Sequence, residues 1–334
     1  MKKAKTNILV VGLLSTGSSA LVDLLREYED IQVIQNEFND FRAPGLVADQ
    51  LGKQEDNFLN EIGKLTSLKY RLRLIYSIFP ILRWEISTIK GIKNRFKFNY
   101  LRIKQLNALK RLNIKLISAI STKEKIDHAN QWIQEIGDIN NCNKEFVLFD
   151  QPLLTAINTE IWKEVFYPFK LIIVFRDPKD QLAEIIKNGK LYDIYGAPNV
   201  NSGGVTLETI YGRSRKAALS IHIEAIKKRY EWIDSLKNEL DKNYLLLVDF
   251  EGLVNNYEFY KTVIHNFIGN SRQYHVKPKI YFDPKNAFKS IGLHREYLKN
   301  DELETFADLE KWYSNTLIRN QVLYNSLYQD IETV

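Results

Sequence analysis

The chain has 334 residues, of which 45% are apolar and 12% aromatic, so it is long and apolar enough to bury the core of a large α/β domain. The single cysteine, Cys142, excludes an intrachain disulfide and any site with several cysteine ligands, and this favours a reducing compartment such as the cytosol. The net charge of +6 is unevenly spread, because residues 64–115 hold fourteen Lys and Arg against Glu85 alone, and the rest of the chain is acidic.

The N-terminal stretch, residues 7–28, predicts a strand, a small-residue loop and a helix in succession. Ile8 to Val11 reads as a buried strand, Gly12 to Ser19 as the loop, and the leucines that follow lie at helical spacing. The pattern Gly12-x4-Gly17-Ser18-Ser19 has the spacing of a nucleotide P-loop, with Ser18 in place of the lysine. A helix start favours anions, so this loop is a candidate phosphate or sulfate site.

The first residues, Met1-Lys2-Lys3 and an apolar run, resemble a signal peptide superficially. We expect no signal, because the run continues directly into the strand-loop-helix pattern. No stretch approaches the roughly 20 apolar residues that span a bilayer. We therefore expect a cytoplasmic protein, soluble or peripheral on the inner membrane face.

A second strand is predicted at Ile31 to Ile34, followed by a polar loop over residues 35–44. The loop contains Glu37 and Asp40. Because loops at the carboxyl ends of parallel strands gather at one sheet edge, Glu37 is expected to face the first loop.

Residues 46–140 read as a helical insertion whose basic part, 64–115, has an apolar and aromatic opposite face. Basic amphipathic helices of this kind favour an anionic membrane surface or a polyanionic acceptor. An ordinary helical cap with solvated charges is the plain alternative. Nucleic acid is the weakest interpretation, and we expect none to bind.

The second half returns to alternating strands and helices, so we predict one α/β domain over residues 1–334 with the insertion inside it. Strands are expected at Phe146 to Phe149, Lys170 to Phe175 and Tyr244 to Val248. After the second of these, Asp177 and Pro178 fit the N-cap and first turn of a helix, which leaves Arg176 at the strand end. Further helices are expected over 207–241, up to Ile268 and over 303–327, with a mobile stretch around 290–295.

Four segments in this order resemble the sulfotransferases that use 3′-phosphoadenosine 5′-phosphosulfate (PAPS) as donor. The loop sequence TGSS is similar to that family's 5′-phosphosulfate loop, and IIVFRDPKDQLAEI is similar to its 3′-phosphate segment. The stretch LLLVDFEGLVNNYEFY resembles a later strand-helix element, and SIGLHREYL resembles the segment that closes over the nucleotide. The resemblance covers the chain apart from the insertion and implies a P-loop-type parallel sheet flanked by helices.

The resemblance also implies roles for particular residues. Ser15, Thr16, Gly17, Ser18 and Ser19 would hold the 5′-phosphosulfate, with the two last hydroxyls assisting catalysis. Glu37, after the second strand, would be the general base, and Arg176 would bind the 3′-phosphate. Arg295, with His294, would cover the nucleotide. No metal is required.

Two departures from the family pattern affect the choice of donor. Ser15 stands where many members have Lys or Arg, and Glu184 stands where a serine commonly binds the 3′-phosphate. A carboxylate repels a phosphate unless it turns away or pairs with a cation. Arg213, Arg215 or Lys216 would then compensate, or the donor differs from PAPS.

The resulting hypothesis is a PAPS-dependent sulfotransferase that modifies a hydroxyl of a glycan or glycolipid. The insertion would dock the enzyme on an anionic membrane or acceptor. A P-loop kinase is an alternative that the missing lysine disfavours. A second alternative is a non-catalytic scaffold of the same fold that binds anions or membranes.

Overall fold

A computed structural model describes residues 5–12, 15–42, 46–52, 89–140, 143–153, 159–193, 214–269 and 275–329. Cys142, Arg213 and residues 64–88 of the predicted basic stretch lie outside the described residues.

Five strands form one sheet in the order β2-β3-β1-β4-β5. The strands are β1 (Thr6–Gly12), β2 (Ile31–Glu37), β3 (Phe146–Asp150), β4 (Phe169–Phe175) and β5 (Leu245–Asp249). Strand β2 pairs with β3, and β4 pairs with β5, both in parallel. Helices flank this sheet, so the predicted α/β class is confirmed.

The chain divides into two compact units, and the boundary falls within β1. The first unit comprises Met1–Asn7 and Asp30–Phe169, and the second comprises Ile8–Glu29 and Lys170–Val334. The expected single domain over 1–334 stays a prediction.

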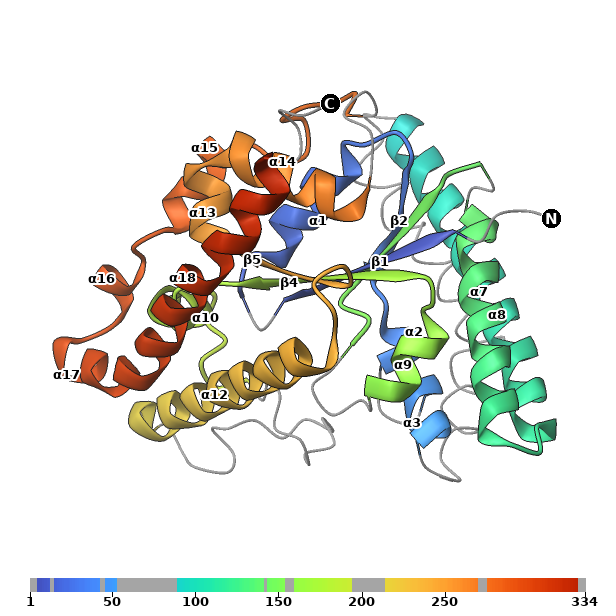
Figure 1. Cartoon of the computed structure of the whole chain (residues 1–334), viewed down its shortest axis with the longest axis horizontal. Helices are drawn as coiled ribbons and strands as arrows, with labels where there is room; N and C mark the ends of the chain where they lie inside the picture. The colour runs from blue at the N-terminus through green and yellow to red at the C-terminus, as the bar shows by residue number, and fades with distance from the viewer. Residues whose placement is uncertain are drawn as a thin grey trace. The chain divides into compact units, whose positions relative to one another are not determined.

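The first unit contains β2, β3 and several helices around an aromatic core. The helices are α2 (Asn39–Arg42), α3 (Val47–Gly52), α7 (Ile89–Ser118), α8 (Thr122–Asn140) and α9 (Thr159–Val165). Figure 1 shows α7 and α8 side by side as a long hairpin. The described parts of the predicted insertion are helical. This agrees with the helical spacing of their leucines and isoleucines.

The second unit contains the strand-loop-helix of the N-terminus and the remaining helices. These are α1 (Ser18–Arg26), α10 (Pro178–Lys187), α12 (Arg215–Glu239), α13 (Phe250–Asn255), α14 (Tyr257–Ile268), α15 (Pro284–Ala287), α16 (His294–Tyr297), α17 (Asn300–Leu303) and α18 (Ala307–Gln329), with 3₁₀ turns at Phe288–Ser290 and Glu304–Phe306. Helix α14 packs against α18 (Figure 1).

The predicted start of α10 is confirmed in detail. Pro178 occupies the first turn, and the Asp177 side chain accepts a hydrogen bond from the Lys179 N–H at 2.8 Å. This cap fixes the direction in which the chain leaves β4, so Arg176 stands at the strand end as expected.

Three predicted boundaries differ from the structure. Strand β2 continues through Glu37, which is therefore the last strand residue rather than part of a loop. The helix predicted over 207–241 is not continuous through Ser214, whose hydroxyl caps the Ala217 N–H at the start of α12, and residues 207–213 lie outside the described residues. The helix predicted up to Ile268 is two helices, because Asn256 ends one and begins the next. A side-chain cap at Ser214 decided the start of α12, whereas Asn256 makes no side-chain cap hydrogen bond at the start of α14.

Among the described helices, none combines the length and the apolar character needed to cross a bilayer.

Glu27, just after α1, is a fully buried carboxylate that organises residues 275–282. It accepts backbone hydrogen bonds from Lys279 at 3.1 Å, Tyr281 at 3.0 Å and Phe282 at 3.1 Å. His275 Nε2 lies 2.8 Å from the same side chain. Because four donors converge on two oxygens, the charge is compensated without contact with water.

We predict that Glu27→Gln lowers the free energy of unfolding by about 2–3 kcal/mol, because the amide group turns a donor toward backbone N–H groups. Urea denaturation would measure the loss. The matched control is Glu29→Gln, since Glu29 is exposed, and it should cost less than about 0.5 kcal/mol. Equal losses in the two variants would contradict the proposed role of Glu27.

Candidate functional site

The loop between β1 and α1 ends in two left-handed residues. Ser15 has φ +47° and Gly17 has φ +84°. Gly17 is the N-cap of α1 and no side chain caps the helix at this position. The start of α1 therefore presents backbone N–H groups and a partial positive charge, as an anion site requires.

Gly17 is packed so closely that no side chain fits there. A Cβ atom on Gly17 would lie 2.2 Å from the Phe250 ring. The same ring lies 4.9 Å from the Arg176 guanidinium carbon. Glycine is thus required both by the backbone conformation and by the contact between the loop and α13.

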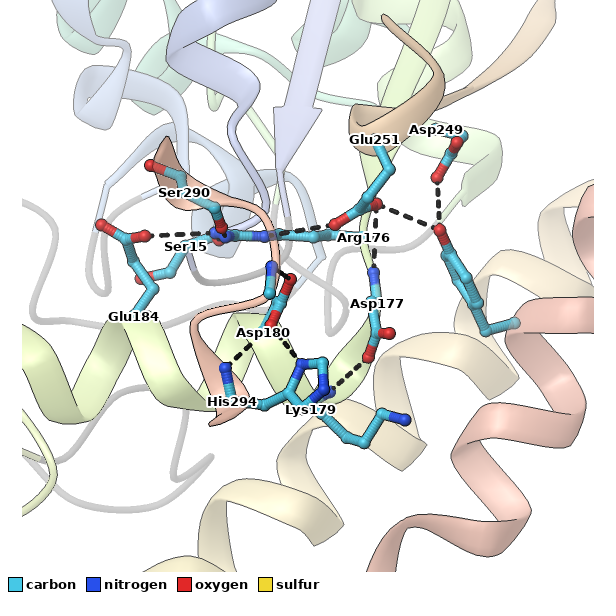
Figure 2. A network of polar contacts seen from close by, with 12 residues as sticks. Ser15, Arg176, Asp177, Lys179, Asp180, Glu184, Asp249, Glu251, Ser290 and His294 are labelled. Carbon is cyan, nitrogen blue, oxygen red and sulfur yellow. Dashed lines mark hydrogen bonds and ion pairs between the residues drawn. The ribbon is translucent and has the colours of Figure 1, made fainter. Parts of the chain in front are cut away.

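Arg176, at the end of β4, is the centre of the polar network in Figure 2. Its side chain is 2% exposed. Nη1 donates to the Ser15 carbonyl oxygen at 3.0 Å, and Nη2 donates to the Ser290 carbonyl oxygen. Arg176 therefore holds Ser15, the left-handed residue of the loop, through its backbone carbonyl.

Two carboxylates also contact the guanidinium. Glu184 Oε2 lies 3.4 Å from Nη1, and Glu251 Oε1 lies 3.5 Å from Nε. Arg176 is thus surrounded by protein oxygens. Nη1 and Nη2 face these protein oxygens, and Nε makes no hydrogen bond with any described residue.

Glu184, the departure noted in the sequence, faces Arg176 rather than turning away. Of the expected compensating cations, Arg215 pairs with Glu302 at 2.7 Å, and Lys216 is exposed. Arg213 lies outside the described residues. The cation that pairs with Glu184 is Arg176 itself.

A buried acidic cluster lies behind Arg176. The Tyr313 hydroxyl lies 2.7 Å from Asp249 Oδ1 and 3.0 Å from Glu251 Oε2 (Figure 2). Burial and the neighbouring Asp249 carboxylate raise the pKa of Glu251 to about 8, against the lowering effect of Arg176. Burial also raises the pKa of Asp249. Near neutral pH this cluster therefore retains a proton.

The sequence analysis did not identify the contact between Glu251 and Arg176. The register explains that contact, because Phe175 of β4 lies opposite Asp249 of β5. The residues that follow the two strands are then neighbours at one sheet edge. The sequence contained this signal, since two adjacent parallel strands end in charged residues.

The predicted mobile stretch 290–295 is anchored at two points. Arg176 binds the Ser290 carbonyl, and Asp180 accepts from Gly292 N–H at 2.5 Å and His294 N–H at 2.9 Å. His294 Nδ1 lies 2.6 Å from the same carboxylate. His294 thus contacts Asp180, while Arg295 is exposed.

The predicted base, Glu37, belongs to the first unit. Its Cα pairs with that of Asp150 at the carboxyl ends of β2 and β3, and its half-exposed side chain bonds Arg42. The rival carboxylate, Asp40, is buried and held by Arg102 of α7, with Nη2 at 2.6 Å. Asp40 therefore attaches α7 to α2, and Glu37 remains the accessible carboxylate of the two.

No group of three or more His, Cys, Asp or Glu within the described residues is placed to hold a metal ion. That no metal is used stays a prediction.

We predict that Gly17→Ala destabilises the fold by about 2 kcal/mol or more, because the left-handed backbone and the clash with Phe250 both oppose a side chain. Urea denaturation would measure the change. Gly189→Ala is the matched control, since Gly189 has φ +69° and nothing within 4 Å of an added Cβ, and it should cost only about 1 kcal/mol. Equal losses would contradict the close contact with Phe250.

We predict that Glu251→Gln changes how stability depends on pH. The pKa of Glu251 is about 8 in the fold against 4.5 ordinarily. Between these values the unfolded chain releases a proton that the folded chain keeps, so stability falls as pH rises, by at most about 1.4 kcal/mol per pH unit. The variant should lose this slope in urea denaturation.

Glu224→Gln is the control for that experiment, because Glu224 is an exposed helix residue 3.9 Å from Lys228. It should keep the slope of the wild-type protein. A Glu251→Gln variant with an unchanged slope would show that Glu251 is ionised in the fold.

No protein-family model matches the chain, and no curated protein matches it. Similar solved structures include the sulfotransferase domain from the Synechococcus PCC 7002 olefin synthase, with 13% identity, 92% of this chain and 96% of that chain covered, and a TM-score of 0.45. Sulfotransferase STF9 from Mycobacterium avium shares 10% identity over 92% of this chain and 76% of its own, with a TM-score of 0.42. The sulfotransferase domain from the curacin biosynthetic pathway shares 10% identity over 93% of this chain and 99% of its own, with a TM-score of 0.43. Likeness at this level carries no statement about activity or substrate.

Proposed function

We propose that this protein is a sulfotransferase that moves a sulfuryl group from PAPS to a hydroxyl of a glycan or glycolipid. The observation that carries the proposal is the loop before α1, whose left-handed Ser15 is bonded through its carbonyl to the buried Arg176 at 3.0 Å. A preformed loop at a helix start favours a bound phosphosulfate. The order of the sequence motifs supports the same reaction.

The bound donor would supply an activated sulfuryl group, and the residues of the chain would position it. The backbone N–H groups of Thr16 to Ser19 would bind oxygens of the phosphosulfate group. The Ser18 and Ser19 hydroxyls would stabilise the charge that develops on the leaving phosphate. Fixed donors of this kind act by electrostatic stabilisation without reorganisation.

Glu37 is the proposed base for the acceptor hydroxyl. It ends β2, and its exposed carboxylate bonds Arg42, which would orient it. A carboxylate within hydrogen-bond reach of the acceptor would take the proton as the sulfuryl group is transferred.

Binding of the donor's 3′-phosphate to Arg176 would require a rearrangement of the contacts of Arg176. Arg176 would have to exchange Glu184 or the Ser290 carbonyl for a phosphate oxygen, because its side chain is 2% exposed. This observation favours a second candidate function, a non-catalytic scaffold in which Arg176 holds the loop and no nucleotide enters.

We predict that adenosine 3′,5′-bisphosphate raises the melting temperature more than ADP does, because only the bisphosphate supplies a partner for Arg176. In Glu184→Ser the shift should be larger, corresponding to about tenfold tighter binding, since the variant removes a carboxylate that repels the phosphate. Differential scanning fluorimetry and isothermal titration calorimetry would measure both effects.

Lys187→Ser is the control, because Lys187 is an exposed residue of the same helix, and it should behave as the wild-type protein. A larger shift with ADP would contradict the PAPS assignment. Bisphosphate binding without transfer of radiolabelled sulfate to any member of a glycan and glycolipid panel would favour the scaffold.

A further inference from the structure

The tip of the α7–α8 hairpin exposes three isoleucines within seven residues. Helix α7 ends at Ser118 and α8 begins at Thr122. Ile114, Ile117 and Ile120 are exposed to 61%, 62% and 97%. Isolated exposed apolar residues need no explanation, but three large ones in succession at one end of a hairpin mark a surface for a partner.

These isoleucines are not part of the helix–helix contact. The face of α7 that is buried is formed by Leu106, Leu109, Leu112 and Leu116. Residues 114 and 117 are three apart, so both lie on the opposite, exposed side of the helix. A change at these positions therefore leaves the hairpin core intact.

The connection that carries Ile120 is held by hydrogen bonds. The Ile120 N–H donates to Glu124 Oε2 at 2.8 Å, and the Glu124 N–H donates to the Ser121 hydroxyl at 3.2 Å. Glu124 is thus turned toward the backbone of the tip. The apolar side chain of Ile120 is presented on a capped turn.

The surroundings of the tip are basic. Helix α7 has nine Lys and Arg and no acidic residue in its 30 positions. Lys110, Lys115 and Lys123 are exposed close to the isoleucines. Arg111, in contrast, pairs with Glu135 of α8.

Apolar side chains ringed by lysines fit one partner chemistry. Lysine stems lie along an apolar surface while their ammonium groups reach phosphates, and isoleucines enter the boundary between headgroups and acyl chains. A second copy of the chain fits less well, because two such basic helices repel each other.

We propose that the hairpin tip, Ile114, Ile117 and Ile120 with Lys110, Lys115 and Lys123, docks the protein on an anionic lipid surface. This surface is independent of the sulfotransferase reaction. The site begins at the C-terminal end of the basic stretch 64–115 and extends beyond it to Lys123.

The test is cosedimentation of the full chain, without nucleotide, with phosphatidylcholine vesicles containing about 30 mol % phosphatidylserine. We expect binding at low salt that weakens as salt is added. Ile117→Asp with Ile120→Asp should reduce the partition coefficient at least about tenfold, and Lys110→Glu with Lys115→Glu should do the same and reduce the salt dependence.

The matched control is Ile318→Asp with Val322→Asp on α18, where the exposed fractions are 70% and 76%. This pair should leave vesicle binding unchanged. Thermal melting of every variant would confirm that each is folded. Absence of wild-type binding, equal binding to pure phosphatidylcholine, or a solution dimer that only the tip variants dissociate would each overturn the proposal.

A second readout locates the tip directly. The single cysteine, Cys142, is replaced by serine, and Ile120→Cys carries an environment-sensitive fluorophore. We expect a blue shift of the fluorescence emission on addition of anionic vesicles. The same label at Ser220→Cys, an exposed position of α12, should show none. Equal responses at the two positions would contradict insertion of the tip.

Discussion

The arrangement of the second unit depends on the contacts of the buried Arg176 guanidinium. It joins the loop before α1, helix α10, helix α13 and the turn at Ser290 through carbonyl and carboxylate oxygens (Figure 2). A buried cation is tolerated only when its donors are paired. Each of these four segments is therefore placed by the need to supply an oxygen to the same side chain.

The same need explains the acidic character of the site. Glu184 and Glu251 compensate Arg176, and Asp249 adds a third carboxylate beside Glu251. Carboxylates this close do not all ionise in a buried environment, so the pKa of Glu251 rises to about 8. In the proposed reaction, an anion that reaches Arg176 would have to displace one of these groups.

Much of the fold was predictable, because period-two and period-3.6 patterns report burial directly. Strands β1, β3, β4 and β5 and the cap at Asp177 were placed to within a residue or two. The position of Arg176 followed from that cap. The partners of Arg176 did not follow, because Ser15, Glu251 and Ser290 are distant from it in sequence; the pairing of β4 with β5 brings only Glu251 beside it.

The sequence by itself determined the α/β class, the strand-loop-helix succession at residues 7–28 and the concentration of positive charge in residues 64–115. These depend on local spacing and composition. Tertiary structure decided that Glu184 pairs with Arg176, that Asp40 holds Arg102, and that three isoleucines stay exposed at the hairpin tip. Such outcomes depend on which side chains compete for the same partner or the same core, and a pattern along one chain does not contain that competition.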